Sequence, residues 1–560
     1  MEESRETILL VCGTGGFTHA APVLELGRVL SQRGHRIELA THRGQEKWVA
    51  TEYYGFISRV HTMGDAMDPE DEAAYYLDMQ KCDPRKSYLD YFRPKFTVDA
   101  FWPSDYAHLK DIVASSRPDM IVADFFVDAV RDIHYLTGIP VAMVWPQMPY
   151  GMVGARHIPG VPGFQIDALS GEHASVWTRL RAELRPLRAI TAIVPYLRYV
   201  WGMRRAQGVN YLLPVTGKPD YLTLVNSFWG LETPKDLPPL LNAVGPILAD
   251  EYPPLDDSLE AFFACHHRVV YVSFGTHIQL QPDHLDQFLA AFGELFREAL
   301  IDGVIWAASE AQQNLFSPEH LVDLGTRSVP VRDLLENRDR SWFFTPFAPQ
   351  RAILERPETI MFVTHGGGSS VNEAVFHGKR MLGLGFFFDQ PLNCLRIQEA
   401  GVGLALDKAD FTTGEVVDKC RRILLDKDGS FAQDVQRMKH IARASSRKKY
   451  YAADLIEEVM YDYKFSLHPP VRSREDGQAD AVKRRRRPMH LQTADVRMSL
   501  WRARNWDLRA IGTFTVLSCV GLGCYAYIHL VKGGVGLRVG WGRALLLKMI
   551  LPTPVVAYIR

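Results

Sequence analysis

The sequence predicts an α/β protein made of two doubly wound domains, and three observations support this fold class. Short apolar runs that end in glycine turns alternate with helix-like segments, which is the pattern of β-α-β units and of a parallel sheet. The pattern stops at a proline-rich stretch, Pro234 to Pro254, and then begins again. The chain has 560 residues, whereas one hydrophobic core usually serves about 100–200 residues.

The first half opens with a β-α-β unit. Residues 7–12 (TILLVC) predict a buried strand, and Gly13-Thr14-Gly15-Gly16 predicts the turn after it. Residues 20–33 carry leucine and valine at positions that form one packed face of a helix. Further strands are expected at residues 36–40, 119–126 and 140–145.

The second half repeats the alternation, with strands expected at residues 268–274, 303–307, 342–345, 360–364 and 380–384. We therefore expect an N-terminal domain over residues 1–245, a linker over 246–262 and a C-terminal domain over 263–440. A helix over residues 441–468 is expected to pack back on the N-terminal domain. Paired sheets of this kind leave a cleft at the carboxyl ends of their strands, where ligands bind.

The C-terminal region predicts a membrane anchor. Residues 469–509 form a basic linker that contains the run Lys483 to Arg487, which is typical of a disordered segment. Residues 510–531 carry no formally charged side chain, and a helix of this length spans about 30 Å of hydrocarbon. The alternative is a buried core helix, although no domain surrounds this run in the sequence. We expect the tail over residues 532–560 to lie on the bilayer surface.

The distribution of charge around residues 510–531 predicts the topology. Basic residues lie on both sides of the span, with an excess on its N-terminal side, which the positive-inside rule places in the cytosol. The N-terminus shows no basic segment followed by a long apolar run, so no signal peptide is expected. We therefore expect a single-pass, C-terminally anchored protein of the endoplasmic reticulum membrane, with its two large domains in the cytosol.

Composition argues against several functional classes. The net charge is -1, so the chain is not expected to bind nucleic acid. Its seven cysteines are irregularly spaced, unlike a disulfide framework or a zinc ribbon. Cys265-His266-His267 lacks the spacing of metal ligands and is read as the entry to a strand. Asp426-Lys427-Asp428 is read as a solvated turn rather than a metal site.

Residues 347–390 contain the strongest motif for a binding site. They predict a helix, a strand, a glycine turn, a second helix, a second strand and an acidic loop. The turn His365-Gly366-Gly367-Gly368-Ser369-Ser370 opens the helix of residues 371–377. Glycines let the backbone approach a ligand, and a helix N-terminus offers unpaired N–H donors to a diphosphate. A purely structural turn would explain the glycines, but not the polar residues at fixed offsets around them.

This stretch resembles the signature of the UDP-glycosyltransferases, which glycosylate small lipophilic molecules in plants, animals and fungi. Weaker similarity extends over most of residues 1–440, including VNSFWGLETP from Val225 and VYVSFGT from Val270. The family has two facing Rossmann-like domains, the arrangement called GT-B. The resemblance implies a membrane-bound hexosyltransferase that takes its sugar from a UDP-sugar and needs no cofactor or metal.

The resemblance also assigns nucleoside contacts. Phe347 stands where the family has a tryptophan that stacks on uracil, and it retains a smaller aromatic face. Gln350 would contact the nucleoside, and Glu373 would accept both ribose hydroxyls.

Other positions would hold the diphosphate and the sugar. The diphosphate contacts implied by the resemblance are His365, Ser370, the backbone around Gly367, and Ser273 with Thr276. Ser369 replaces the asparagine of many members, which shortens the side chain. Asp389 and Gln390 would bind hydroxyls of the transferred sugar.

His19 is the candidate catalytic base, because a histidine pKa lies near neutrality and the acceptor hydroxyl must lose a proton. It follows the first glycine turn, at the mouth of the expected cleft. In the family this position carries the catalytic histidine, followed three residues later by a proline, here Pro22. Asp124, at the end of a buried strand, matches the carboxylate that orients that histidine.

The implied reaction is a single displacement with inversion, in which His19 takes the acceptor proton and UDP leaves. We expect glucose as the sugar and a sterol, lipid, phenolic or xenobiotic hydroxyl as the acceptor. The alternatives are glucuronosyl transfer and a non-catalytic membrane protein that binds UDP-sugar. A dinucleotide-dependent oxidoreductase is disfavoured, because the third glycine of its fingerprint falls on Thr18. Epimerases and phosphorylases of this fold lack the motif of residues 347–390.

Residues 177–207 carry seven arginines and one acid, interleaved with leucine, isoleucine and tryptophan. Two interpretations remain open. The segment forms either an amphipathic helix packed on its own domain or a membrane-facing helix.

Overall fold

The computed structural model describes residues 5–532 apart from residues 84, 150, 156, 161–171, 212–216 and 466–488. The chain divides into two units, residues 1–492 and 493–560. The basic run Lys483–Arg487 and the expected tail after Lys532 lie outside the described residues.

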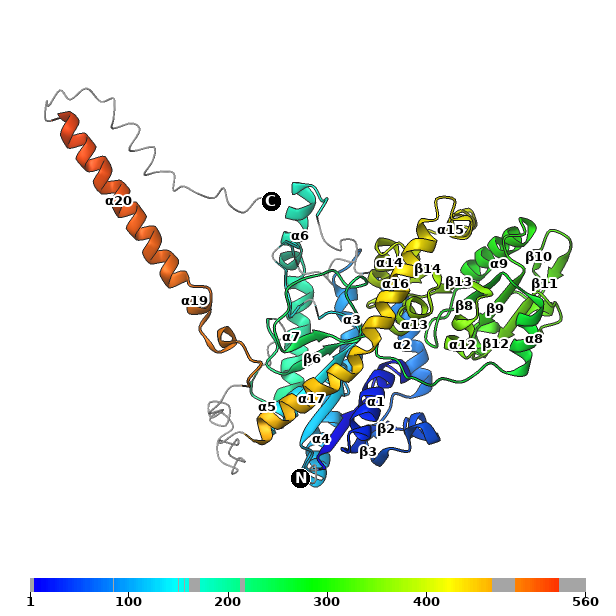
Figure 1. The fold of residues 1–560 in the computed structure, drawn as a ribbon, viewed down its shortest axis with the longest axis horizontal. Helices are drawn as coiled ribbons and strands as arrows, with labels where there is room; N and C mark the ends of the chain where they lie inside the picture. The colour runs from blue at the N-terminus through cyan, green and yellow to red at the C-terminus, as the bar shows by residue number, and fades with distance from the viewer. Residues whose placement is uncertain are drawn as a thin grey trace. The chain divides into compact units, whose positions relative to one another are not determined.

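The first unit contains two parallel sheets, so the α/β fold class predicted by the sequence is confirmed (Figure 1). The N-terminal sheet has the strand order β3-β2-β1-β4-β5-β6-β7. Its strands are β1 (Thr7–Val11), β2 (Arg36–Arg43), β3 (Ile57–Asp65), β4 (Met120–Asp124), β5 (Val141–Trp145), β6 (Leu222–Val225) and β7 (Leu241–Ala243). Its helices are α1 (Phe17–Gln32), α2 (Pro69–Lys81), α3 (Leu89–Asp99), α4 (Trp102–Ser116), α5 (Ala129–Thr137), α6 (Val176–Arg188) and α7 (Ile190–Ala206).

Strand β1 is apolar throughout its centre because helices cover both faces of the sheet. Ile8 and Leu10 pack against α1, while Leu9 and Val11 pack in the cluster that contains residues of α4 and α5. Alternate side chains of a strand point to opposite faces, so a continuous apolar run is what a two-sided core requires.

The C-terminal sheet has the strand order β12-β9-β8-β13-β14-β15. Its strands are β8 (Val269–Ser273), β9 (Gly303–Ala307), β12 (Trp342–Thr345), β13 (Thr359–Thr364), β14 (Arg380–Gly385) and β15 (Gly403–Asp407), with a separate antiparallel pair β10 (Leu321–Asp323) and β11 (Ser328–Pro330). Its helices are α8 (Asp257–Cys265), α9 (Pro282–Arg297), α10 (Glu310–Gln313), α11 (Val331–Leu335), α12 (Gln350–Glu355), α13 (Gly368–His377), α14 (Gln390–Glu399), α15 (Thr413–Leu425) and α16 (Ser430–Ser446).

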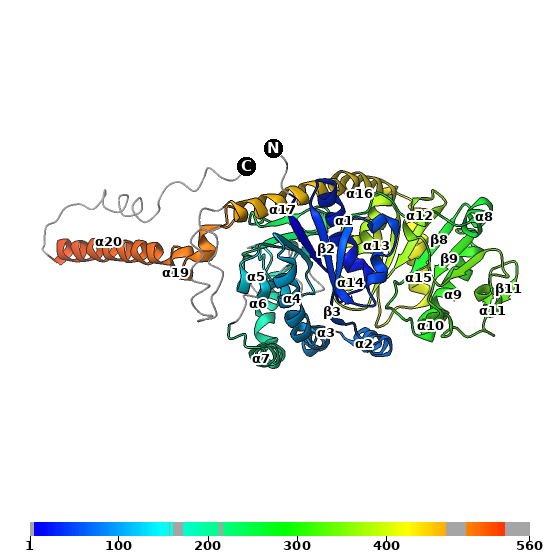
Figure 2. The ribbon, with the colours of Figure 1, turned by 90° about the horizontal axis from the view of Figure 1, so that it is seen from below.

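Helices α16 and α17 (Lys448–Lys464) connect the two domains (Figures 1 and 2). Met438 of α16 lies in a core cluster of the C-terminal domain, whereas Ile456 of α17 lies in the core beneath the N-terminal sheet. At the start of α17, the buried Lys449 Nζ donates to Glu25 Oε1 and to Asp250 Oδ1, each at 2.7 Å. Removing one partner of such a buried ion pair is strongly destabilising, so these bonds fix α17 on α1.

Each sheet has one point at which its strand order reverses. In the N-terminal sheet this point lies between β1 and β4, and in the C-terminal sheet between β8 and β13. Ligands of doubly wound folds bind at the carboxyl ends of the strands at such a point. The fold therefore provides two candidate half-sites in one unit of the chain.

The second unit contains the short helix α19 (Leu500–Ala503) and the long helix α20 (Trp506–Lys532). The apolar run expected at residues 510–531 lies inside α20. This helix is long and apolar enough to cross a membrane, and none of its apolar window is buried in the structure. Insertion into a membrane remains a prediction.

Candidate active site

His19 and Asp124 meet at the reversal point of the N-terminal sheet. His19 lies in the first turn of α1, Asp124 ends β4, and β4 pairs directly with β1. The His19 Nδ1 is 3.1 Å from Asp124 Oδ1. Asp124 Oδ2 accepts a hydrogen bond from the backbone N–H of Phe126 at 3.1 Å. The imidazole is therefore oriented through Nδ1, which leaves Nε2 for a ligand.

Two carboxylates make His19 a stronger base than a free imidazole. Burial disfavours the charged imidazolium, but the charge and hydrogen bond of Asp124 and then the charge of Asp389 outweigh it. The net result is that the pKa of His19 is raised from its ordinary value of 6.5. Asp389 belongs to the C-terminal domain, so its charge acts on His19 across the boundary between the two domains.

Aromatic rings and a glycine surround His19. Gly15 has a φ of 102°, and a Cβ added there would lie 2.7 Å from His19 Cδ2, so this position requires glycine. The ring centroid of His19 lies 4.6 Å from that of Phe126 and 5.7 Å from that of Phe125. Phe126 in turn lies 6.0 Å from Phe388 of the C-terminal domain. The surroundings of the base are therefore largely apolar.

The second reversal point holds Ser273, which ends β8, and His365, which directly follows β13. A Cβ on Gly275 would lie 2.9 Å from His365 Cε1, and a Cβ on Gly367 would lie 2.4 Å from His365 Nε2. The imidazole thus lies between two positions that cannot carry a side chain. Burial, and then the nearby His277, lower the pKa of His365 to about 4. His365 is therefore neutral at neutral pH and would contact an anion as a hydrogen-bond donor.

The N-terminus of α13 lies next to this turn. Gly367 is its N-cap and supplies no side-chain cap, and Ser369 and Ser370 lie in the first turn. Uncapped N–H groups and the positive end of the helix dipole suit a phosphate group. Thr276 lies exposed just beyond β8.

Gln350 of α12 and Glu373 of α13 form a polar pair next to Ser370. Gln350 Nε2 donates to Glu373 Oε2 at 2.7 Å and to Ser370 Oγ at 3.3 Å. Burial raises the pKa of Glu373, although Gln350 and Arg351 oppose this effect. Phe347 follows β12 and is 78% exposed, so its ring face is free for a planar ligand.

Asp389 is the N-cap residue of α14 and is partly exposed, whereas Gln390, the first residue of the helix, is buried. Asp389 Oδ2 accepts a hydrogen bond from Asn393 Nδ2 at 2.8 Å. Gln390 is buried, and its Oε1 accepts from the N–H groups of Phe386 at 3.1 Å and Phe387 at 3.4 Å. The side-chain oxygen of Gln390 therefore holds the preceding loop, and its amide nitrogen is the group left to donate to a ligand.

Direct contacts join the two half-sites. Ser369 Oγ donates to the carbonyl of Thr18, next to the base, at 3.4 Å. Asn372 Nδ2, also in α13, donates to the carbonyl of Asn226 at 2.8 Å. These two bonds place the first turns of α13 against the N-terminal domain, with Ser369 beside the residue that precedes His19.

A buried ion pair that the sequence did not predict joins α14 to the N-terminal domain. Arg396 of α14 lies 3.0 Å from Glu232 of the N-terminal domain, and both side chains are almost fully buried. Glu232 Oε1 also accepts from the N–H of Met148 at 3.1 Å. Burial raises the pKa of Glu232 to about 7 and lowers that of Arg396 to about 9. Glu232 lies in the segment VNSFWGLETP, but Arg396 lies outside the motif of residues 347–390. The sequence therefore showed no sign that these two residues pair.

His277 is a second residue that the sequence analysis missed. Its ring stacks on Tyr76 of α2, with centroids 3.9 Å apart. Burial, and then the charge of His19, lower its pKa to about 4. His277 directly follows Thr276, so its position beside the predicted phosphate contacts is the one signal that could have identified it.

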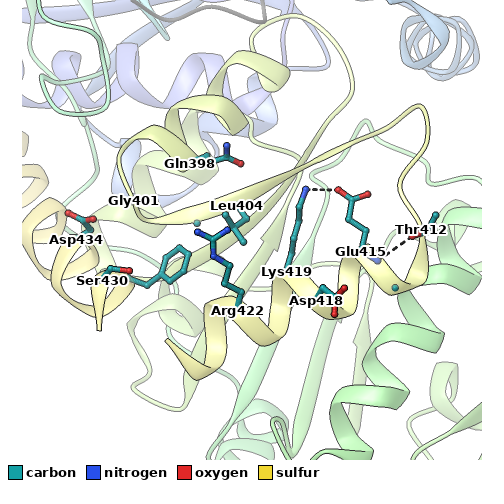
Figure 3. Close-up of a pocket in the computed structure, with 13 residues that line it drawn as sticks. Gln398, Gly401, Leu404, Thr412, Glu415, Asp418, Lys419, Arg422, Ser430 and Asp434 are labelled. Atoms are coloured by element: carbon teal, nitrogen blue, oxygen red, sulfur yellow. Dashed lines mark hydrogen bonds and ion pairs between the residues drawn. The ribbon is translucent and has the colours of Figure 1, made fainter. Parts of the chain in front are cut away.

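A hollow of 770 Å³ lies outside the cleft, between α14, α15 and α16 (Figure 3). Its lining includes Lys419 and Glu415, which pair with each other at 2.5 Å. No candidate site residue lines it, so we assign it no part in the chemistry of the cleft.

The described residues contain no group of three or more histidines, cysteines or acids placed to hold a metal. Cys265 ends α8, and His266 and His267 lie in the short connection that leads into β8, close to the expected strand entry. Asp426-Lys427-Asp428 does form a turn between α15 and α16, and Lys427 and Asp428 are exposed as expected, but the side chain of Asp426 is not. Its carboxylate is buried and pairs with Arg380 at 2.8 Å, while it accepts from the N–H groups that begin α16.

Comparison with known proteins identifies similar sequences along nearly the whole chain. The family profile described as "UDP-glucoronosyl and UDP-glucosyl transferase" matches residues 212–448. UDP-glycosyltransferase FPY2 of Fusarium mangiferae is 37% identical over 549 residues, covering 95% of this chain and 100% of that protein. UDP-glycosyltransferase stmC of Aspergillus ustus is 40% identical over 531 residues, covering 92% of this chain and 96% of that protein.

Solved structures share the fold. The glycosyltransferase of kitacinnamycin aligns with a TM-score of 0.55 at 19% identity, covering 81% of this chain and 99% of that one. A UDP-glucose: anthocyanidin 3-O-glucosyltransferase, solved in complex with UDP, aligns with a TM-score of 0.54 at 17% identity, covering 81% of this chain and 99% of that one. Both support the GT-B arrangement expected from the sequence.

Proposed function

Because the chain belongs to the UDP-glycosyltransferase family, we propose that it transfers glucose from UDP-glucose to a hydroxyl of a small lipophilic acceptor, with inversion at the anomeric carbon. The observation that carries this proposal is the His19–Asp124 contact of 3.1 Å, placed beside the uncapped N-terminus of α13. A base and an anion site border the same cleft, which a single displacement requires.

The proposed step exchanges one bond for another at the anomeric carbon. His19 Nε2 takes the acceptor proton, the acceptor oxygen bonds to the anomeric carbon, and the bond from that carbon to the phosphate oxygen breaks. Asp124 stabilises the imidazolium that forms. The N–H groups of α13 and the neutral His365 stabilise the negative charge that develops on the leaving UDP.

The donor assignment rests on the residues that line α13. Gln350 and Glu373 are already paired, so a ribose would exchange hydroxyl hydrogen bonds for theirs. Phe347 offers an exposed ring to uracil. Asp389 supports glucose over glucuronate, because its carboxylate can accept from a sugar hydroxyl but would repel a second carboxylate.

The acceptor assignment rests on the rings of Phe125, Phe126 and Phe388 around the base. A cavity of 40 Å³ adjoins Gly15 and is lined in part by Met67, Tyr75, Tyr76 and Phe101. The apolar part of this lining favours a lipophilic acceptor, and its polar part consists of Thr14, His42, Gln45 and Glu72. Since the cavity is small, an acceptor such as a sterol has to displace side chains of α2.

We also infer that α20 anchors the enzyme in the endoplasmic reticulum membrane, with the catalytic domains in the cytosol. The length and composition of α20 and the arginines that precede it support this topology. The vesicle experiment on α20 below tests insertion.

Removing the base should abolish turnover. We expect His19→Ala to lower UDP release from UDP-glucose about 10²–10⁴-fold, the usual contribution of a general base, and Asp124→Asn to lower it less. Release is measured with a mixed pool of lipophilic acceptors. His61 makes a similar buried bond, to Glu38 at 2.7 Å, and His61→Ala is the matched control that should retain turnover. Equal rates in wild type and His19→Ala would favour a non-catalytic UDP-sugar-binding protein.

The donor preference is checked in the same assay. We expect faster UDP release from UDP-glucose than from UDP-glucuronate, because Asp389 disfavours a second carboxylate. Asp389→Asn should bring the rate of UDP release from UDP-glucuronate closer to the rate from UDP-glucose. A wild-type enzyme that prefers UDP-glucuronate would contradict the proposed sugar and leave the proposed base untouched.

The proposed mechanism uses no metal. We expect UDP release to be unchanged by EDTA, because backbone N–H groups and His365 take the place that a divalent cation has in metal-dependent transferases. Loss of activity in EDTA that Mn²⁺ restores would count against this mechanism.

The pH dependence should report His19. Since the pKa of His19 is raised from 6.5, kcat/KM should fall as the pH drops through a value above 6.5, where the imidazole becomes protonated. Asp124→Asn removes the charge that stabilises the imidazolium, so this acidic limb should move to lower pH. An unchanged limb in Asp124→Asn would show that another group titrates.

A further inference from the structure

Two consecutive helices of the N-terminal domain turn apolar side chains away from the core. The exposed residues are Val176, Trp177, Leu180, Leu184 and Leu187 in α6, and Ile190, Val194, Leu197 and Trp201 in α7. Their exposed fractions run from 37% to 80%. An amphipathic helix of a globular protein normally turns its apolar stripe inward. Helix α7 does pack on its own domain, as one interpretation of residues 177–207 expected, but these apolar side chains lie outside that packing.

The apolar residues of α6 lie on the side of the helix opposite its buried residue. Successive residues of a helix are rotated by about 100°, so Trp177, Leu180, Leu184 and Leu187 share one face. Ala182 lies on the other side, and it is buried. The apolar stripe of α6 is thus the face that the domain leaves exposed.

Contacts with α3 fix the orientation of α7. The hydroxyl of Tyr196 donates to Asp99 Oδ2 at 2.5 Å, and that of Tyr199 donates to the carbonyl of Phe96 at 3.2 Å. Both tyrosines lie on the side of α7 away from Leu197 and Trp201. The exposed stripe of α7 therefore follows from bonds on its opposite side.

Arginines border the apolar stripe. Arg204 is buried and paired with Asp132, but Arg179, Arg181, Arg188, Arg198 and Arg205 are exposed. The guanidinium of Arg181 lies 5.3 Å from the ring centre of Trp177, and that of Arg205 lies 6.0 Å from that of Trp201. Apolar side chains bordered by tryptophan and arginine are typical of a helix at the boundary between lipid headgroups and acyl chains.

We propose that the α6–α7 face, defined as the nine exposed apolar residues and the five exposed arginines named above, docks on the surface of a bilayer that contains anionic phospholipids. The apolar side chains enter the headgroup boundary, and the arginines bind lipid phosphates. The docking does not depend on which sugar the enzyme transfers.

Charge favours lipid over another protein copy. Residues 177–207 carry seven arginines against Glu183 alone, so two copies of the face would bring like charges together in a two-fold contact. Anionic lipid headgroups complement the same charge. Helix α20 follows in the same chain, so a bilayer that takes up α20 is within reach of the first unit.

The test uses the full chain with its candidate span disrupted, so that α20 does not dominate binding. The span-broken variant carries Phe514→Asp, Leu517→Asp and Val520→Asp. We expect the wild type to stay with vesicles after alkaline extraction and the span-broken variant to be released. At neutral pH the span-broken variant should still float with vesicles of phosphatidylcholine and phosphatidylserine, and less with phosphatidylcholine alone.

Substitutions in the face then decide the proposal. In the span-broken background, Leu180→Ser with Leu184→Ser, or Arg181→Glu with Arg188→Glu, should lower partitioning to the anionic vesicles roughly tenfold or more. The matched controls are Leu321→Ser and Arg338→Glu, which change exposed residues of the C-terminal domain. Circular dichroism and the thermal midpoint verify that each variant is folded.

Three outcomes would overturn the proposal. The first is flotation that the face substitutions leave unchanged, and the second is an equal loss in the controls. The third is a dimer without lipid that Leu180→Ser with Leu184→Ser dissociates while flotation stays constant, which would make the face a contact between copies.

Discussion

Parallel strands bring their carboxyl ends to one edge of a sheet, and this constraint places the functional residues of the chain. Because β1 lies beside β4, His19 and Asp124 come within 3.1 Å although they are 105 positions apart. Because β8 lies beside β13, Ser273 and His365 meet in the same way. The two reversal points thus assemble the proposed base and the proposed anion site from residues that are distant in sequence.

The proposed reaction requires the half-sites of the two domains to face each other. Buried ion pairs fix the position of one domain on the other. Lys449 fixes α17 on the N-terminal domain, and Arg396 joins α14 to Glu232. Since α14 begins at Gln390, directly after Asp389, this pair also supports the two residues that we propose bind the sugar. Buried ion pairs contribute less to stability than to geometry, because desolvation offsets most of their attraction. Here the Arg396–Glu232 pair positions α14 and thus Asp389, whose charge helps to raise the pKa of His19.

The sequence predicted what local pattern encodes. Continuous apolar runs such as Ile8–Val11 predict buried strands. The glycine turn around Gly367 predicts an anion site. Strand β3 was missed because the exposed Arg59 and the buried but polar His61 interrupt any apolar run, and β7 because three residues carry too little pattern. Glu232–Arg396 and the stacking of His277 on Tyr76 are pairings between distant elements, which no spacing records. The outward turn of α6 and α7 also depends on tertiary contacts, since the sequence shows an apolar stripe but not the side it faces.

The central claim is that one displacement, driven by His19 across the cleft, joins sugar to acceptor. The configuration of the product tests it most directly. The wild-type enzyme is supplied with UDP-α-glucose and an accepted phenol, and the anomeric proton of the purified product is read by NMR before any equilibration. The account predicts a β-glucoside, formed with inversion. An α-glucoside would mean retention, and would contradict the role assigned to His19 and Asp124.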